Sequence, residues 1–306
     1  SSNSGSAVTF SSGTKDVFVT KPARAINQTD LIAGGRLSIA TGNPHNSAVT
    51  GASNLYYTPY SSSTIFLWTG SHWAPYSLTS DLSISNTGLV ASRNYDVSIA
   101  WNSGSPQLVL TIWSNHNAGT SARATALTYQ DQIPLLSGNR YIGTIRTDAS
   151  NLFADGYENR FVWNAYNRVR KPVYRDPGVA TYTLNSTTFR YCNNSGANIV
   201  SWVTGIDGAS AINLFLYSGG SSPGAATLTI SALAMNGVDT VAPLYGGTLA
   251  SYVYNLTTTQ NYMVGSFWGG LEVGYNFAGW RERVVAATTI TMYGTGRAAI
   301  VGEIEC

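Results

Sequence analysis

Short segments of alternating hydrophobic and polar residues follow one another along most of the chain. In residues 95–101 the odd positions are Tyr95, Val97, Ile99 and Trp101, so one face of an extended strand there is apolar and belongs to the core. Similar segments recur about every ten residues, separated by turn residues. The first half is expected to form strands at 16–20, 37–40, 54–58, 63–69, 73–78, 81–85, 95–102 and 107–114.

This spacing predicts antiparallel pairing in a sandwich or jelly roll, because strands follow each other without a clear helical pattern between them. Two hairpins are indicated, one turning at Gly70-Ser71 and one at Ser103-Gly104. Residues 121–132 are the one stretch with possible helical spacing, and strand plus loop is the alternative there.

A second series of strands begins after the turn Asp176-Pro177-Gly178, where we place a domain boundary. Before it, strands are expected at 140–147 and within 159–169. After it they are expected at 181–184, 188–191, 199–204, 212–217, 226–234, 251–256, 262–268, 288–294 and 298–304. The prediction is an all-β chain with two antiparallel β-sandwich (jelly-roll-like) domains, 16–176 and 177–306, behind a flexible Ser/Gly-rich arm at 1–15.

Composition strengthens the all-β interpretation. Only 10% of the 306 residues are charged and 31 are glycine, whereas soluble proteins average about 25% charged residues. The formal net charge of +2 indicates neither a nucleic-acid nor an anionic membrane partner. Apolar runs fall far short of the ~20 residues of a membrane span, and the first residues lack the pattern of a signal peptide.

The two cysteines, Cys192 and Cys306, show no C-x-x-C spacing. Two unpaired thiols are the favoured interpretation, and a disulfide between them is the alternative. The three histidines, His45, His72 and His116, lie in polar segments without the spacing of a ligand set. We therefore expect no metal and no cofactor.

Two groups of aromatic residues are candidates for glycan binding, because exposed rings stack on the apolar faces of sugars. The first flanks hairpin loops and the second is interleaved with glycines in what is predicted to be a long loop. In both groups, packing in the interior is the competing interpretation. The first group is Tyr56, Tyr57, Tyr60, Trp68, Trp73 and Tyr76, and the second is Tyr262, Phe267, Trp268, Tyr275, Phe277 and Trp280. Trp68, Trp73, Phe267, Trp268, Tyr275 and Trp280 are the receptor-binding candidates among them.

The charged residues do not indicate a catalytic site. The basic run Arg168, Arg170, Lys171 and Arg175, with Arg160 nearby, suits either anionic glycans or, as we favour, a salt-bridged linker face. Acidic residues are scattered singly, whereas glycan cleavage needs a carboxylate pair. No nucleophile elbow, phosphate loop or zinc-protease helix motif is present, so we expect no enzyme and no catalytic residues.

Two segments carry a resemblance to a known group of proteins. NRYIGTIRT (139–147) and NRFVWNAYNRV (159–169) resemble a segment that recurs in bacteriophage tail-fibre and minor virion structural proteins, and LYYTPY (55–60) and NYDV (94–97) look similar too. The resemblance covers roughly residues 30–175, while the loop 148–158 and Ala165 depart from it. It implies a place at the virion surface and assembly as a homo-oligomer, usually a trimer, with β-rich adhesion modules.

The function expected from sequence is therefore a tail-fibre or receptor-binding component of a bacteriophage, contributing to assembly and host attachment. Its expected partners are further copies of itself, other virion proteins and host-surface glycans. A capsid decoration or head-fibre protein, anchored by the Ser/Gly arm, is one alternative. A carbohydrate-degrading enzyme of the virion is the other.

Overall fold

Strands and turns make up the described chain. The computed structural model describes residues 31–306 apart from 46–47, 103, 207–210, 222–226, 238–248, 256–260, 271 and 286–288. Within these residues the one helical element is the 3-10 turn η2 (Cys192–Asn194). The predicted all-β class is confirmed, and the helical alternative at 121–132 is wrong, because turns and the short strand β9 (Thr128–Gln130) occupy it. The predicted arm (1–15) and the first strand (16–20) lie outside the described residues.

The first half forms three antiparallel sheets. Their strands are β1 (Gly35–Ser38), β3 (Asn54–Pro59), β4 (Thr64–Trp68), β5 (Trp73–Ser77), β6 (Leu82–Ser85), β7 (Asn94–Asn102), β8 (Ser105–Ile112), β9, β10 (Ile133–Leu136), β11 (Asn139–Arg146) and β14 (Val162–Asn164). The orders are β1-β3-β6, the hairpin β4-β5, and a six-stranded sheet β8-β7-β11-β10-β9 in which β14 also pairs with β11.

Two further sheets contain the strands of the second half together with four strands from before residue 177. The strands of the first are β2 (Val49–Ala52), β12 (Phe153–Asp155), β13 (Asn159–Arg160), β17 (Arg190–Tyr191), β18 (Ile199–Thr204), β20 (Thr227–Met235), β21 (Leu249–Asn255) and β23 (Gly274–Val284). Those of the second are β15 (Arg170–Arg175), β16 (Thr181–Leu184), β19 (Ala211–Ser221), β22 (Asn261–Gly270), β24 (Ile290–Tyr293) and β25 (Ala299–Glu305). The orders are β2-β12-β13-β18-β23-β20-β21, with β17 on β23, and β15-β25-β19-β24-β16, with β22 on β19.

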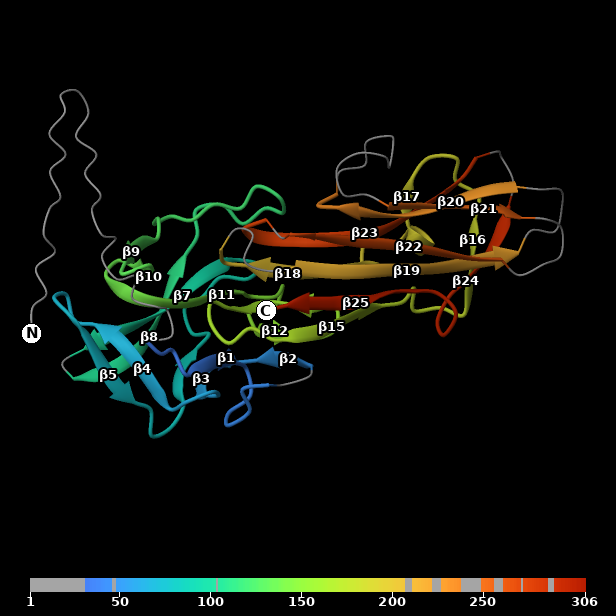
Figure 1. Ribbon diagram of the computed structural model, residues 1–306. Helices are drawn as coiled ribbons and strands as arrows, with labels where there is room; N and C mark the ends of the chain where they lie inside the picture. The colour runs from blue at the N-terminus through green and yellow to red at the C-terminus, as the bar shows by residue number, and fades with distance from the viewer. Residues whose placement is uncertain are drawn as a thin grey trace, which may run out of the picture.

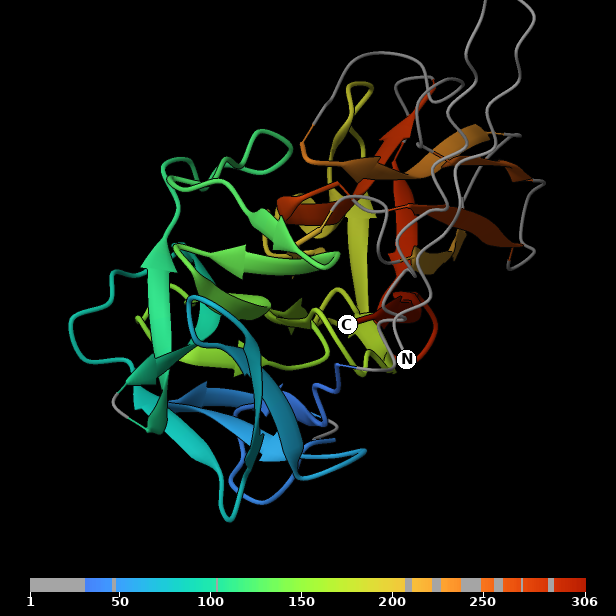
Figure 2. The ribbon, with the colours of Figure 1, turned by 60° about the vertical axis from the view of Figure 1, so that its left-hand side comes forward.

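Hydrogen bonding continues across the predicted domain boundary. The eight-stranded sheet joins β13 to β18 in parallel, and β15, which precedes residue 177, pairs with β25 at the other end of the chain. Figures 1 and 2 show the long strands of the second half extending side by side away from the first-half sheets. The two parts are therefore linked by backbone hydrogen bonds as well as by the chain itself.

Two hydrophobic clusters fill the interior. The first includes Tyr95, Val97 and Ile99, with Trp101 packed against it, as the alternation of this strand predicts. The second is formed mostly by residues of the eight-stranded sheet and of the sheet that contains β15 and β25, and it includes Trp202 and Trp280. Full burial of a large side chain is worth several kcal/mol, on the order of 3 for an aromatic residue, so these clusters supply the main stabilising term.

Strand β11 contributes to both clusters. Ile142 and Ile145 belong to the first cluster, whereas Tyr141 packs in the second. A Cβ atom at Gly205 would collide with the Tyr141 hydroxyl. Glycine is therefore required where the turn after β18 meets β11, and the two halves pack closely there.

Candidate functional site

The aromatic pair Trp68–Trp73 lies at the end of the β4–β5 hairpin. The two residues are direct cross-strand partners, and their ring centroids are 5.4 Å apart at an interplanar angle of 60°. The turn closes as predicted, with a hydrogen bond of 3.0 Å from the Thr69 amide to the His72 carbonyl and with Gly70 at a φ of 96°. Only a residue that tolerates positive φ suits that position.

Trp73 is held in place from two sides. Its indole N–H donates a 3.0 Å hydrogen bond to Asp131, and the Arg140 guanidinium lies 5.5 Å from its ring centroid. Both indoles are half-buried and keep accessible area. A fixed, partly exposed indole pair is the kind of surface on which a sugar ring stacks without a large ordering cost.

The other tyrosines of this first aromatic group divide between interior and surface. Tyr57 is fully buried, and its hydroxyl accepts a hydrogen bond of 3.1 Å from the Gly35 amide. Tyr76 is half-buried and packs edge-on against Trp101, beside the first cluster. Tyr60 is exposed. The interior alternative therefore holds for Tyr57, whereas Tyr60 and the Trp68–Trp73 pair remain available at the surface.

The predicted long loop of the second aromatic group is wrong. Its residues lie in β22 and β23, and β23 pairs with both β18 and β20. Gly279 is needed for packing, because a Cβ atom there would lie 2.9 Å from the Tyr191 ring. Gly279 thus permits close packing against the Tyr191 ring, which the sequence pattern did not distinguish from a loop.

Of the four receptor-binding candidates in that group, two have described side chains. Trp280 is fully buried, which corrects its assignment as a receptor contact. Tyr275 is half-buried, and its ring stacks 3.7 Å from the Arg146 guanidinium carbon. Phe267 and Trp268 lie in β22, opposite Leu214 and Asn213, and their side chains are outside the described residues.

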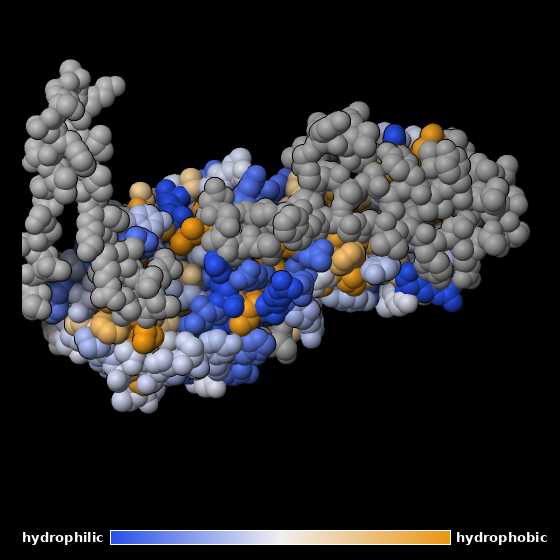
Figure 3. Space-filling model, viewed as in Figure 1, coloured by the Kyte–Doolittle hydropathy of each residue, from blue (hydrophilic) through white to orange (hydrophobic). Residues whose placement is uncertain are grey.

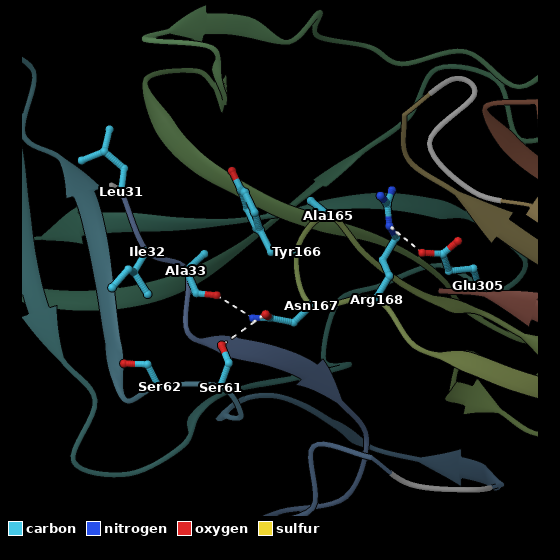
Figure 4. Close-up of a pocket in the computed structure, with 10 residues that line it drawn as sticks. All are labelled: Leu31, Ile32, Ala33, Ser61, Ser62, Ala165, Tyr166, Asn167, Arg168 and Glu305. Atoms are coloured by element: carbon cyan, nitrogen blue, oxygen red, sulfur yellow. Dashed lines mark hydrogen bonds and ion pairs between the residues drawn. The ribbon is translucent and has the colours of Figure 1, made fainter. Parts of the chain in front are cut away.

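A pocket of about 550 Å³ was not predicted from the sequence. Figure 4 shows it between the segment that precedes β1, the loop before β4, and the turn that follows β14. Its lining residues are Leu31, Ile32, Ala33, Ser61, Ser62, Ala165, Tyr166, Asn167, Arg168 and Glu305. The wall combines an aromatic ring, hydroxyl groups and one ion pair, a mixture typical of sites for polar small molecules.

Asn167 ties the pocket walls together. Its amide nitrogen donates hydrogen bonds to the carbonyls of Ala33 (2.7 Å) and Gly35 (3.0 Å), and its amide oxygen lies 3.2 Å from the Ser61 hydroxyl. The residue has a φ of 53°, in the left-handed region that asparagine tolerates better than most residues. The turn and the facing segment are thus fixed relative to each other.

Arg168 and Glu305 form the charged part of the pocket wall. The Arg168 Nε and Glu305 Oε1 atoms are 3.7 Å apart, and the two side chains are 26% and 41% exposed. That separation is too long for a direct hydrogen bond. The pair therefore presents a donor and an acceptor side by side with no net charge.

The basic run is salt-bridged, in agreement with the interpretation we favoured, although most of it lies in β15 instead of a linker. Arg170 pairs with Glu303 at 2.8 Å and Arg175 with Glu158 at 2.6 Å. Lys171 and Arg160 pair with the buried Asp155. Figure 3 shows hydrophilic residues gathered in the middle of the visible face, where β15 and the end of β25 lie in Figure 1.

The cysteines are free thiols, and both are buried. Among the described residues no group of three or more His, Cys, Asp or Glu side chains is arranged to hold a metal ion. The same part of the chain contains no helix long and apolar enough to cross a membrane.

Comparisons with known proteins do not place the chain in a family. No family model and no curated protein matches it. Among solved structures, it is similar to the insecticidal delta-endotoxin Cry8Ea1 of Bacillus thuringiensis (TM-score 0.26, 11% identity, 91% of this chain and 54% of that chain). It is also similar to a Cry1Da tryptic core variant from the same bacterium (TM-score 0.20, 8% identity, 92% and 53%) and to infectious bursal disease virus, Gx strain (TM-score 0.20, 11% identity, 89% and 82%).

The chain thus spans about half the length of the two toxins. TM-scores of 0.26 and below support no shared fold family and no shared function.

Proposed function

We propose that this chain is a bacteriophage virion surface protein, a tail-fibre or receptor-binding component that contributes to assembly and attaches to host-surface glycans. The observation that carries the attachment role is the Trp68–Trp73 pair, two half-buried indoles 5.4 Å apart, one of them fixed by Asp131 and Arg140. The virion role is supported by the resemblance of residues 30–175 to phage structural segments.

Assembly with further copies, expected as a trimer, is supported by the sheet edges. Strand β8 ends the six-stranded sheet and contains no charged residue from Ser105 to Ile112. Proteins commonly protect exposed edges with charged residues, proline, bulges or a covering element, and β8 has a proline, Pro106, only at its second position. An uncharged edge of eight residues fits burial against another subunit.

The proposal assigns no catalytic role. Asp96, Asp155 and Glu282 are the buried carboxylates, and each is ion-paired with an arginine or lysine in the described structure. Paired, buried carboxylates suit a structural role, whereas glycoside hydrolysis uses two carboxylates flanking the bond to be cleaved.

Glycan binding is tested with the full chain on an array of bacterial lipopolysaccharides and capsular polysaccharides. We expect selective retention of one or a few glycans and about tenfold weaker binding after Trp68→Ala, because a ring contact contributes about 1.5 kcal/mol. Tyr217→Ala is the matched control, since Tyr217 is a 43% exposed aromatic residue on β19, in the second half. Retention of no glycan, or equal losses in both variants, would contradict the attachment role.

The oligomeric state is tested by light scattering on the eluting peak of a size-exclusion column. We expect a mass of three chains. A monomer at micromolar concentration would contradict the proposed assembly, because the β8 edge would then not be buried against another subunit. Antibody labelling of intact particles then separates tail from head, because label on the capsid would favour a decoration or head-fibre role.

A further inference from the structure

Arg140 connects the Trp68–Trp73 pair with the pocket. Its side chain is fully buried, and its guanidinium carbon lies 5.5 Å from the Trp73 ring centroid and 4.8 Å from that of Tyr166, a pocket residue. Its Nη1 atom donates hydrogen bonds to the carbonyls of Ile32 (3.2 Å) and Phe66 (2.6 Å). The buried Arg140 guanidinium therefore holds the Trp68–Trp73 pair and the pocket wall in fixed positions relative to each other.

Strand β4 connects the segment beside the pocket with the Trp68–Trp73 hairpin end. Ile65 and Leu67 point into the core, whereas Phe66 and Trp68 alternate with them and are half-exposed. The Phe66 amide donates a 2.9 Å hydrogen bond to the carbonyl of Ile32, which lines the pocket and is 40% exposed. Phe66 and Ile32 are thus partly exposed apolar residues at neighbouring backbone positions, on the segments that lead from the indole pair to the pocket.

The pocket chemistry fits a sugar. Arg168 offers N–H donors and Glu305 an acceptor within 3.7 Å of each other, a spacing that suits two neighbouring hydroxyl groups on one ring. The Tyr166 ring and the Ser62 side chain complete the wall. The volume of about 550 Å³ lies within the range of small-ligand sites.

We infer that the pocket is a second subsite of the same glycan site, so that the ligand is a neutral oligosaccharide with one sugar on the Trp68–Trp73 pair and a vicinal diol against Arg168 and Glu305. This inference rests on the proposed glycan attachment. The Glu305 carboxylate repels an anionic sugar, and the pair as a whole has no net charge to attract one. The two subsites together account for the preference for more than one sugar unit.

The test uses the full chain and the array-positive glycan cut to fragments of one, two and three sugar units, in neutral form and with a carboxylated unit. Calorimetry or intrinsic tryptophan fluorescence gives the affinities for the unsubstituted protein, Arg168→Ala, Glu305→Gln and Trp68→Ala. Arg170→Ala is the control, because the Arg170–Glu303 pair is an exposed ion pair on the adjoining strands and does not line the pocket. Thermal unfolding confirms that each variant is folded.

We expect two-unit ligands to bind about tenfold or more tightly than one-unit ligands. Arg168→Ala and Glu305→Gln abolish that gain and leave one-unit binding unchanged, while Trp68→Ala weakens both and Arg170→Ala changes neither. Equal affinity for one and two units, a preference for the carboxylated form, or pocket variants that bind normally would overturn the second subsite and leave the proposed function standing. Binding of no glycan at any length would overturn both.

Discussion

Tyr182 donates a 2.7 Å hydrogen bond to the Glu282 carboxylate, although the two residues are 100 positions apart. The other carboxylate oxygen accepts the Asn193 amide at 3.1 Å and pairs with Arg190 at 3.3 Å. Burial raises the pKa of Glu282 to about 7, and the hydrogen bonds from Tyr182 and Arg190 offset only part of that rise. An acidic group that changes charge near neutral pH thus lies within the second half.

The stability of the protein is expected to fall as pH rises from about 4.5 to about 7. In that range the folded state holds a proton on Glu282 that the unfolded chain, with a pKa of 4.5, has released. Protonation therefore favours the folded state below pH 4.5, and this stabilisation is lost as pH passes the folded pKa of about 7. The loss is on the order of 3 kcal/mol, because each pKa unit corresponds to about 1.4 kcal/mol. Urea unfolding at a series of pH values measures it.

Glu282→Gln is expected to flatten this pH profile, because glutamine keeps the shape of the side chain and does not titrate. Glu303→Gln removes a carboxylate whose side chain is 43% exposed and is the control, expected to keep the original slope. A Glu282→Gln profile as steep as that of the unsubstituted protein would assign the pH dependence to other groups.

Arg123 is expected to be more important for stability than any exposed arginine. Its Nε and Nη2 atoms donate to both carboxylate oxygens of the buried Asp96, at 2.7 and 3.1 Å. Arg123→Ala leaves that carboxylate buried without its cation, which costs about 3–5 kcal/mol of unfolding free energy. Arg170→Ala, in an exposed ion pair, should cost about 1 kcal/mol or less. Similar midpoints for the two variants in denaturant unfolding would refute this difference.

Trp280→Ala is expected to destabilise the fold without altering glycan affinity. The side chain is fully buried in the second hydrophobic cluster, so its removal leaves a cavity and costs about 3–5 kcal/mol. Binding measured well below the midpoint of thermal unfolding should match that of the unsubstituted protein. A selective loss of binding in a variant of unchanged stability would restore Trp280 as a receptor contact.

The strands were predictable wherever apolar and polar residues alternate. Residues 95–101 and the hairpin at Gly70 follow this pattern, and their positions agree with β7 and the β4–β5 turn. In β7 the polar face is buried as well, since Asp96 and Ser98 are covered in the folded chain. Strand β23 was missed because both its faces carry glycine and aromatic residues, which imitate a loop pattern. Its place inside the eight-stranded sheet is set by pairing with β18 and β20, and the local sequence contains no pattern that predicts this pairing.

Of the candidate site, the sequence predicted the aromatic pair and did not predict the pocket. Trp68 and Trp73 are five residues apart around a turn, so local geometry alone places them together. The pocket combines four separate segments, and Arg168 and Glu305 meet only because β25 returns to lie beside β15. Such a meeting depends on the order of strands in a sheet, which a single sequence does not reveal.

Neither cysteine is expected to react with a thiol reagent in the folded protein. Burial raises the pKa of Cys306 to about 11 and holds that of Cys192 well above its ordinary value, and the thiolate is the reactive form. The Cys192 thiol also donates to the Tyr182 hydroxyl at 3.1 Å, so it belongs to the Glu282 network. Labelling with Ellman's reagent at pH 8 should give no fast phase in buffer and two thiols in guanidinium chloride. Fast labelling of either thiol in buffer would show that its burial is broken by opening of the surrounding strands, because the reagent reaches only an exposed thiolate.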